Sequence, residues 1–297
     1  MRFSVRVPAS SANLGSGFDT LAVALGLFTT VTVEPAQSNV VFDGGPDLAG
    51  GENLIEQGMR LAAGTAGLAL PPCRVAVSSD IPVARGLGSS ATALVAGLLA
   101  GNHLLGEPLS RQQIFGLATG IEGHGDNVSA SLFGGVTLSL ICADRVVCRQ
   151  IPLGGALQVV LFVPDAFGLT ADARAVVPTM IPRQDAVANL GRCALLIMSL
   201  MHGDFTLLGE AMQDTLHQPY RSKLFPHVAP MIEAAVGHGA FGACLSGAGP
   251  SVLAFVDPEC AAHVAEALND EAGSRDVAGS AVVLDIVTEG AIITDSI

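Results

Sequence analysis

The chain has 297 residues, of which 50% are hydrophobic, 14% are charged and 35 are glycine. This composition excludes disordered, coiled-coil and collagen-like proteins, because each of those has a different signature. Acidic residues outnumber basic ones by 27 to 14, and the net charge of −13 argues against nonspecific binding of nucleic acid or of an anionic membrane. We expect a globular protein of one or two domains.

Lysine is almost absent from the chain, since Lys223 is the only one and the other basic residues are arginines. A Walker A phosphate loop requires a lysine after glycine and before serine or threonine, and no such sequence is present. The protein-kinase signature is excluded as well, because it requires a lysine on a strand. Schiff-base chemistry would have to use Lys223.

The cysteines are scattered, and they form neither a C-x-x-C pair nor a zinc-binding pattern. Their neighbours are mostly apolar, so we expect buried, reduced thiols and no disulfide framework. Residues 2–7 alternate in polarity, unlike a signal peptide. The longest apolar stretches, 91–101 and 193–201, are shorter than the roughly 18 residues of a membrane span. These observations predict a cytoplasmic protein.

Period-2 alternation of apolar residues predicts strands at 2–7 and 27–34, with a polar, glycine-containing loop at 8–19 between them. The remaining elements expected in the first half are a helix at 52–66, a strand at 73–79, a glycine loop at 82–90, a buried helix that ends near 105, a helix at 110–122, a turn and helix around 123–127, and strands at 136–140 and 145–151.

Gly154 and Gly155 follow a proline, and they mark the expected boundary between domains at 1–155 and 156–297. The elements expected after them are a strand at 157–163, helices at 183–201, 204–213, 226–238 and 258–269, and strands at 240–245, 251–256 and 281–287. Interleaved helices and strands in both halves predict an α+β protein with two layers.

The segment Gly86-Leu87-Gly88-Ser89-Ser90-Ala91 is the most informative motif. Glycines allow a backbone to approach a ligand closely, and the N-terminus of the following helix offers free N–H groups to a phosphate. Turn glycines in a glycine-rich chain are the simpler alternative. The same string also fits the dinucleotide fingerprint, although a proline-led loop separates it from its strand and no acidic residue follows at the required distance.

Three further segments place polar residues in apolar surroundings. They are Asn13 with Asp19, the group from Glu122 through His124 and Asp126 to Asn127, and the glycine-rich loop 246–251. Each alone is explained by the preference of these residues for turns. Together with the glycine loop, however, they favour a nucleotide site.

Three motifs in this order resemble those of the GHMP small-molecule kinases: Pro8–Asp19, Pro82–Ala91 and Leu245–Ser251. The resemblance spans nearly the whole chain. Within that superfamily, further stretches resemble the homoserine kinases, namely Glu122–Val128 with Leu132–Gly135, Thr170–Arg174, Arg183–Asp185 and Gln218–Arg221.

The resemblance implies an N-terminal domain like ribosomal protein S5 and a C-terminal ferredoxin-like domain, with ATP and homoserine bound between them. It implies ATP-dependent phosphorylation of the homoserine hydroxyl in threonine biosynthesis. The residues that it assigns to ATP are Pro82, Val83, Ala84, Arg85, Gly86, Leu87, Gly88, Ser89, Ser90, Ala91, Thr92, Gly247 and Gly249. Those assigned to homoserine are Asn13, Asp19, His124, Asn127, Arg174 and Arg221, and those assigned to catalysis are Asp19, Ser90, Thr170 and Arg174. Magnesium is assigned to Ser90 and Glu122.

The charges of an amino-acid substrate agree with this assignment, because Asp19 complements an ammonium while Arg174 and Arg221 complement a carboxylate. Two points stay open: Glu122 is either the magnesium ligand or a glutamate beside the histidine, and Arg85 either contacts phosphate or is solvated. Gly125 also departs from the family, which commonly has proline there. Phosphoryl transfer depends on positioning, so no strong base is required.

Three other functions are alternatives to this one. They are another GHMP kinase, such as one for mevalonate or shikimate, an inactive ligand-binding relative, and a nucleotide-linked oxidoreductase. A homodimer is expected, and neither nucleic acid nor a membrane is expected as a partner.

Overall fold

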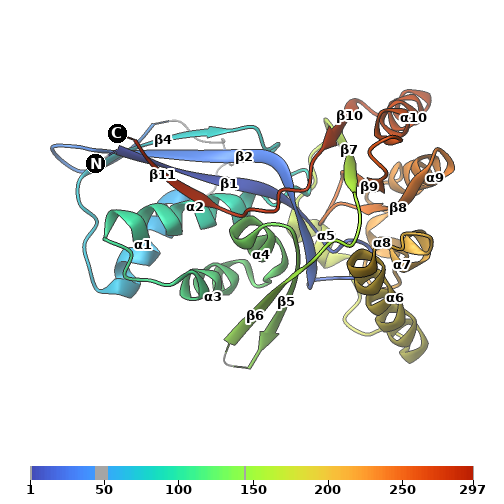
Figure 1. Ribbon diagram of the computed structural model, residues 1–297, viewed down its shortest axis with the longest axis horizontal. Coiled ribbons are helices and arrows are strands. Elements are labelled where there is room, and N and C mark those ends of the chain that lie inside the picture. The colour runs from blue at the N-terminus through green and yellow to red at the C-terminus, as the bar shows by residue number, and fades with distance from the viewer. Residues whose placement is uncertain (1, 44–52, 144, 297) are drawn as a thin grey trace.

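The computed structural model of the protein describes residues 2–43, 53–143 and 145–296. Its strands form one sheet of seven strands and another of four, and helices pack against both, so the predicted α+β class is confirmed. Figure 1 shows the two sheets side by side along the long axis of the molecule. Within the described part of the chain, no helix is both long and apolar enough to span a bilayer.

The seven-stranded sheet has the order β11-β1-β2-β4-β3, and β5 pairs with both β2 and β6. All of its pairs are antiparallel except β3 with β4. The strands are β1 (Arg2–Ala12), β2 (Leu21–Pro35), β3 (Val40–Asp43), β4 (Cys73–Ser79), β5 (Val136–Cys142), β6 (Arg145–Ile151) and β11 (Ile292–Ser296).

The loop expected at 8–19 is wrong in its first part, because β1 continues to Ala12 after a register shift between Pro8 and Ala9. Residues 7–12 are all buried, so the strand has lost the alternation that identifies its first half. The start of β2 was missed for the same reason, since Leu21–Leu25 is an entirely buried run.

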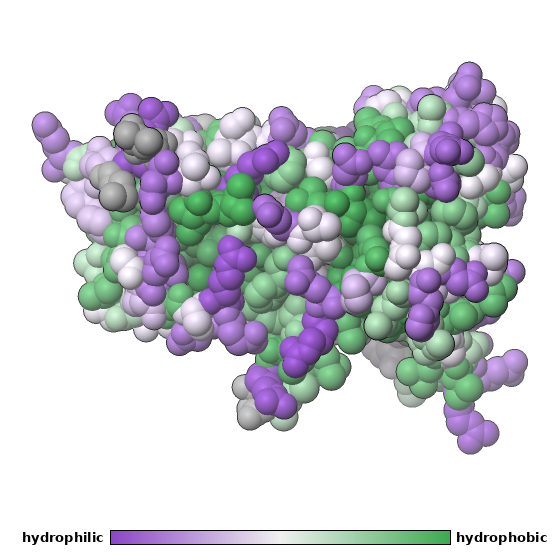
Figure 2. Space-filling model, in the orientation of Figure 1, coloured by the Kyte–Doolittle hydropathy of each residue, from purple (hydrophilic) through white to green (hydrophobic). Residues whose placement is uncertain are grey.

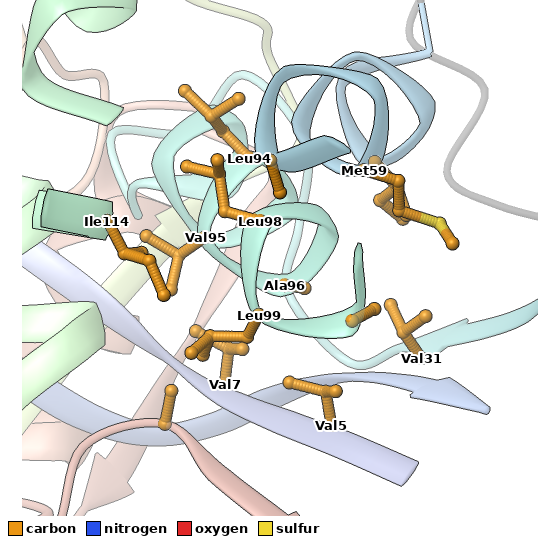
Figure 3. Packing of buried hydrophobic residues seen from close by; sticks show 14 of the residues in the cluster. Val5, Val7, Val31, Met59, Leu94, Val95, Ala96, Leu98, Leu99 and Ile114 are labelled. Carbon is orange, nitrogen blue, oxygen red and sulfur yellow. The ribbon is translucent and has the colours of Figure 1, made fainter. Parts of the chain in front are cut away.

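Four helices cover this sheet on one side: α1 (Leu54–Ala66), α2 (Ser89–Leu104), α3 (Arg111–Glu122) and α4 (Asp126–Phe133). Asn53 caps α1, and Ser110 with Gln113 forms the predicted capping box of α3. The first residue of the helix expected at 52–66 lies outside the described residues. Helix α2 is buried from Ala91 to Asn102, because the sheet, α1 and α3 surround it (Figure 3).

Backbone contact between α1 and α2 depends on glycine. A Cβ on Gly97 would lie 2.2 Å from the carbonyl oxygen of Ile55, and one on Gly58 would lie 2.7 Å from the carbonyl oxygen of Leu94. The two helices therefore pack closely, and α2 is held firmly with its N-terminus directed toward the second sheet.

The four-stranded sheet is antiparallel, with the order β10-β7-β9-β8. Its strands are β7 (Gln158–Pro164), β8 (Ala240–Leu245), β9 (Val252–Val256) and β10 (Gly279–Leu284). Helices α9 (Val228–Gly237) and α10 (Ala261–Ser274) cover one face. Along the other lie α6 (Arg183–His202), α7 (Leu208–Ala211) and α8 (Gln218–Arg221).

One hydrophobic cluster joins the two halves of the molecule. Leu21 and Leu25 of β2 belong to it together with Leu161 of β7 and Leu253 of β9. The strand β11 adds a second link, because it returns from the C-terminal part to pair with β1. The two sheets therefore share buried apolar contacts close to the segments that carry the motifs.

Several predicted elements need correction. The helix expected at 204–213 is reduced to α7, and α5 (Thr170–Ala175), α8, β3 and β11 were not predicted. These elements have four to six residues each, too few for a periodic pattern to identify. The helix expected at 258–269 spans 261–274, and the strand expected at 281–287 spans 279–284.

The glycine contact between α1 and α2 predicts that Gly97→Ala lowers the free energy of unfolding by about 1–3 kcal/mol, because the added methyl group collides with backbone. Gly64→Ala is the matched control, since nothing lies within 4 Å of its Cβ position on α1. It should stabilise the protein by about 0.5–1 kcal/mol. Urea unfolding measures both, and stabilisation by Gly97→Ala would contradict the close packing.

Candidate active site

The candidate site lies where three backbone segments meet: the end of β1, the loop before α2 and the loop between β8 and β9. The Ser10 N–H donates to the Leu87 carbonyl oxygen at 3.1 Å. The hydroxyl of Ser246 donates to the Gly86 carbonyl oxygen at 2.8 Å and lies 2.8 Å from the hydroxyl of Ser11. Residues from both halves of the chain are thus joined by hydrogen bonds at this site.

The glycines at this junction are required by both conformation and space. Gly86 and Gly88 have φ of +75° and +67°, a region that favours glycine. A Cβ on Gly86 would lie 2.2 Å from the Ser246 carbonyl oxygen, and one on Gly88 would lie 2.2 Å from the Ser10 hydroxyl. Gly86 therefore allows the loop before α2 to contact the loop between β8 and β9, and Gly88 allows it to contact β1.

A cavity of about 420 Å³ opens at this junction. The predicted site residues that line it are Asn13, Asp19, Ala84, Gly86, Leu87, Gly88, Ser89, Ser90, Glu122, His124, Asn127, Thr170, Arg174, Arg221 and Gly247. These come from distant parts of the sequence, so the fold brings most of the predicted residues together.

Other predicted residues lie outside the lining: Pro82, Val83, Arg85, Ala91, Thr92 and Gly249. The Arg85 guanidinium donates to the carbonyl oxygens of Val83, Pro164 and Asp165 and stacks on Phe167. Arg85 therefore connects the glycine loop to the end of β7. Two alternatives were considered for Arg85, contact with phosphate and solvation, and these contacts match neither of them. The hydroxyl of Thr92 donates to the Gly88 carbonyl oxygen at 2.8 Å, within the first turn of α2.

The N-terminus of α2 faces this cavity. Gly88 is the N-cap and carries no side chain, so no side chain occupies the first N–H groups of the helix. Ser89 and Ser90, in the first turn, line the cavity. Free N–H groups and the positive end of the helix dipole make this point suitable for a phosphate without any lysine.

Ser90 and Glu122 form the candidate metal site. The Ser90 hydroxyl donates to Oε2 of Glu122 at 3.3 Å. Burial raises the pKa of Glu122, although the charge of His124 and the hydrogen bond from Ser90 act in the opposite direction. A hydroxyl and a carboxylate are the oxygen ligands that magnesium prefers, so this donor set fits the ion.

His124 is buried beside Asp126, with Nδ1 2.5 Å from Oδ1 of that carboxylate. Its Nε2 lies 3.8 Å from Oε2 of Glu122. Burial alone would lower the pKa of His124, but the hydrogen bond and charge of Asp126 outweigh it, and the pKa lies above the ordinary value. The imidazole is therefore stabilised in its protonated form between two carboxylates.

Asp19 and Arg174 form a bidentate ion pair across the cavity. The two guanidinium nitrogens donate to the two carboxylate oxygens at 2.9 and 3.1 Å. Arg174 comes from α5, and Asp19 lies in the loop between β1 and β2 with φ of +55°. The opposite charges predicted to bind a substrate thus contact each other in this structure.

Arg221 is 2% exposed, although it is a cation. Its Nε donates to the Ala173 carbonyl oxygen at 3.0 Å, and its Nη1 donates to the Gly247 carbonyl oxygen at 3.1 Å. Burial lowers its pKa to about 10, with a further contribution from the charge of Arg174. At neutral pH it is therefore a buried positive charge at the edge of the cavity.

The side chains of Asn13 and Asn127 both form hydrogen bonds with other parts of the protein. The Asn13 amide nitrogen donates to the Gly247 carbonyl oxygen at 2.8 Å, and its amide oxygen accepts the N–H of Asp19 at 3.0 Å. Oδ1 of Asn127 accepts the Ser10 hydroxyl at 2.9 Å. Asn13 thus holds the loop that presents Asp19, whereas the amide nitrogen of Asn127 has no acceptor among the described residues.

Sequence reasoning missed several residues of this site. Ser10 and Ser11 lay in the quoted first motif, and Ser246 in the third. Their contacts, Ser10 with Asn127 and Ser11 with Ser246, connect parts of the chain more than a hundred residues apart. His217 precedes the quoted stretch 218–221 by one residue and contacts Arg221. Its position next to that stretch was the only signal available.

A larger hollow of about 1610 Å³ lies on the second half of the molecule, between α7, α9 and the edge of β8. Its polar lining includes Arg192, Glu210 and Glu233, and it contains none of the predicted site residues. Size alone therefore does not identify the active site, and the convergent charges and the helix N-terminus favour the smaller cavity.

Comparison with known families and proteins shows the family of the chain. The model described as the GHMP kinases N terminal domain matches residues 53–135, and the model described as GHMP kinases C terminal matches residues 196–274. The chain is 40% identical over 293 residues to a homoserine kinase of Desulfitobacterium hafniense, and the alignment covers 97% of this chain and 99% of the relative. It is 44% identical over 261 residues to a homoserine kinase of Deinococcus radiodurans, over 86% and 84% of the two chains.

Solved structures show the same relationship. The crystal structure of homoserine kinase from Cytophaga hutchinsonii aligns with a TM-score of 0.89 at 27% identity, over 98% of this chain and 97% of the other. A crystal structure of mevalonate kinase aligns with a TM-score of 0.72 at 17% identity, over 96% and 99%. At that identity the second comparison shows the fold alone.

The contact between His124 and Asp126 predicts that Asp126→Asn lowers the pKa of His124, because burial lowers it and the hydrogen bond and charge that oppose burial are lost. In the wild type the raised pKa stabilises the fold below pH 6.5, and this contribution disappears as the pH rises through the folded-state pKa. Titration of the imidazole by NMR measures the shift, and Asp172→Asn, an exposed change on α5, is the control. An unchanged pKa in Asp126→Asn would contradict this account.

Proposed function

This chain belongs to the homoserine kinases of the GHMP kinase family, and from that membership we infer that it transfers the γ-phosphoryl group of ATP to the side-chain hydroxyl of L-homoserine. The product, O-phospho-L-homoserine, serves threonine biosynthesis. The observation that carries this function is the cavity in which Asp19, Arg174 and Arg221 lie close to the uncapped N-terminus of α2. One site then holds complements for both an amino acid and a phosphate.

We propose that the loop 82–90 and the first turn of α2 bind the triphosphate. Gly86 and Gly88 bring backbone close to the cavity, and Ser89 and Ser90 add hydroxyl donors. Gly247 lines the same cavity from the opposite loop. Backbone N–H groups and a helix dipole supply positive potential, which explains how a chain with one lysine and a net charge of −13 binds a polyanion.

Magnesium is proposed to bind at Ser90 and Glu122. Their hydroxyl and carboxylate oxygens are 3.3 Å apart and line the cavity. When bound, the ion neutralises charge on the transferring phosphoryl group. The carboxylate of Glu122 would then carry its negative charge with less cost from burial.

The ion pair between Asp19 and Arg174 suggests how homoserine is recognised. An amino acid carries an ammonium and a carboxylate. It can therefore replace the ion pair between Asp19 and Arg174 by two ion pairs, one between its ammonium and Asp19 and one between its carboxylate and Arg174. Arg221 supplies the second guanidinium for the carboxylate. Because Asp19 and Arg174 are paired before the substrate arrives, neither charge is left without a partner in the cavity.

The acceptor hydroxyl is proposed to lie near His124 and Thr170, which both line the cavity. The raised pKa of His124 favours the ring as a hydrogen-bond donor to this hydroxyl. The proton is therefore proposed to pass to the phosphate or to solvent, and the rate depends on positioning and charge neutralisation. Asn127 is proposed to offer its amide nitrogen to the substrate.

Further proposals concern the assembly and location of the protein. We propose a homodimer, which is supported by an exposed apolar row on α6: Val187, Leu190, Met198 and Met201. Elsewhere, Figure 2 shows hydrophilic residues over much of the visible face with apolar areas between them.

A cytoplasmic location is proposed because the six cysteines are unpaired. The domain division at 155/156 is likewise a proposal, with 292–296 added to the first sheet.

The first prediction of this function is ATP-dependent turnover. A coupled assay of ADP release should show magnesium-dependent activity with L-homoserine, and none with mevalonate or shikimate. Activity with another alcohol but not with homoserine would overturn the substrate and leave the family unchanged. Binding of a nicotinamide dinucleotide at micromolar concentration would favour the oxidoreductase alternative instead.

A second prediction separates the two subsites. Arg221→Leu should raise the KM for homoserine by about 10- to 100-fold and leave the KM for ATP within about twofold, because a charged hydrogen-bond donor to the carboxylate is lost. Ser90→Ala should mainly reduce turnover and raise the magnesium concentration that is needed. Arg149→Leu, an exposed change on β6, is the control. Equal effects on both substrates in both variants would show that the subsites are wrongly assigned.

A further inference from the structure

His217 is a fully buried histidine that the proposed function has not used. Its Nε2 lies 2.9 Å from the Gly15 carbonyl oxygen, and its Nδ1 lies 3.2 Å from Nη1 of Arg221. A carbonyl oxygen only accepts, so Nε2 must carry the hydrogen. A guanidinium nitrogen only donates, so Nδ1 must offer a lone pair. The two contacts together select one neutral tautomer.

The charge state of the ring agrees with this geometry. Burial lowers the pKa of His217 to about 4, and the positive charge of Arg221 acts in the same direction, whereas the Asp214 carboxylate opposes it. At neutral pH the ring is therefore neutral, whereas Arg221 is charged. An imidazolium would instead place an N–H against the guanidinium.

The position of the ring is constrained on all sides. Its face stacks on Phe18, with centroids 5.0 Å apart and an interplanar angle of 17°. Asp214 accepts the N–H groups of residues 216, 217 and 218 at 2.6–2.8 Å, which holds the start of α8. A Cβ on Gly15 would lie 2.0 Å from the Met212 carbonyl oxygen, so the acceptor of the Nε2 hydrogen is held by close backbone packing.

The donors of Arg221 can be counted against their acceptors. A guanidinium has five N–H groups. One on Nε goes to Ala173, and the two on Nη1 go to Gly247 and to Nδ1 of His217. The two on Nη2 have no acceptor among the described residues, and Arg221 lines the cavity.

We propose that His217 is a positioning residue, whose Nδ1 lone pair fixes the Arg221 guanidinium so that Nη2 is directed to the carboxylate of the substrate. The inference rests on the proposed function, because the carboxylate is that of homoserine. Without the acceptor, a buried Nη1 hydrogen would be unsatisfied, and the guanidinium would rotate toward another oxygen. His217 does not contact the reacting atoms and acts through Arg221.

Two substitutions separate this role from simple packing. His217→Asn places an acceptor oxygen on Cγ, near the position of Nδ1, and loses the contact with Gly15. His217→Gln places a nitrogen near the position of Nε2, keeps the contact with Gly15, and loses the acceptor for Arg221. Both remove the ring from Phe18, so their thermal unfolding midpoints should fall together.

The test measures the KM for homoserine, the KM for ATP and the inhibition constant of 3-aminopropan-1-ol, which is homoserine without its carboxylate. In His217→Gln we expect the homoserine KM to rise about tenfold, with the ATP KM and the inhibition constant within about twofold of the wild type. In His217→Asn the homoserine KM should stay within about threefold, because the acceptor is restored.

Equal increases in the homoserine KM of the two variants would overturn the proposal, since the ring would then act only through packing. A parallel rise in the inhibition constant of 3-aminopropan-1-ol would overturn it as well, because that molecule has no carboxylate. A wild-type protein that fails to phosphorylate homoserine would be a different result. It would overturn the proposed function, and with it the carboxylate that Arg221 is inferred to bind.

Discussion

The contact between the glycine loop and the loop that joins β8 to β9 is the constraint on which this site depends. Gly86 and Ser246 approach so closely that a single methyl group on Gly86 would lie 2.2 Å from a carbonyl oxygen. The N-terminus of α2 follows the first loop, and Gly247, an acceptor of Arg221, belongs to the second. Separation of the two halves would therefore break the proposed phosphate site and the proposed carboxylate site together.

This site presents positive groups although the chain as a whole is acidic. The positive groups that face the cavity include a helix terminus and two arginines, of which Arg174 is held by Asp19 and Arg221 by backbone carbonyl oxygens. Arg221 is almost completely buried, so its field is screened by little water. Few cations are needed when they are fixed in this way, and the overall net charge of −13 does not describe the potential inside the cavity.

Much of the fold and of the site could be predicted from the sequence, because long periodic helices and glycine motifs are local signals. The end of β1 could not, since burial on both faces had removed its alternation. Strand β11 could not be predicted either, because its partner lies at the other end of the chain. The pairing of Asp19 with Arg174 was missed for a related reason: each residue was matched to a ligand, whereas only the fold shows that they reach each other.

The loop after β1 shows why binding residues and structural residues cannot be separated here. Asn13, Leu14 and Asp19 all have positive φ, a conformation that costs a residue other than glycine about 1–3 kcal/mol. Asn13 compensates for part of this cost, because its amide bridges Gly247 and the N–H of Asp19. Gly247 of the second half of the chain thus helps to hold the strained loop. The loop that carries Asp19 and the loop that binds Arg221 are therefore linked through the same glycine.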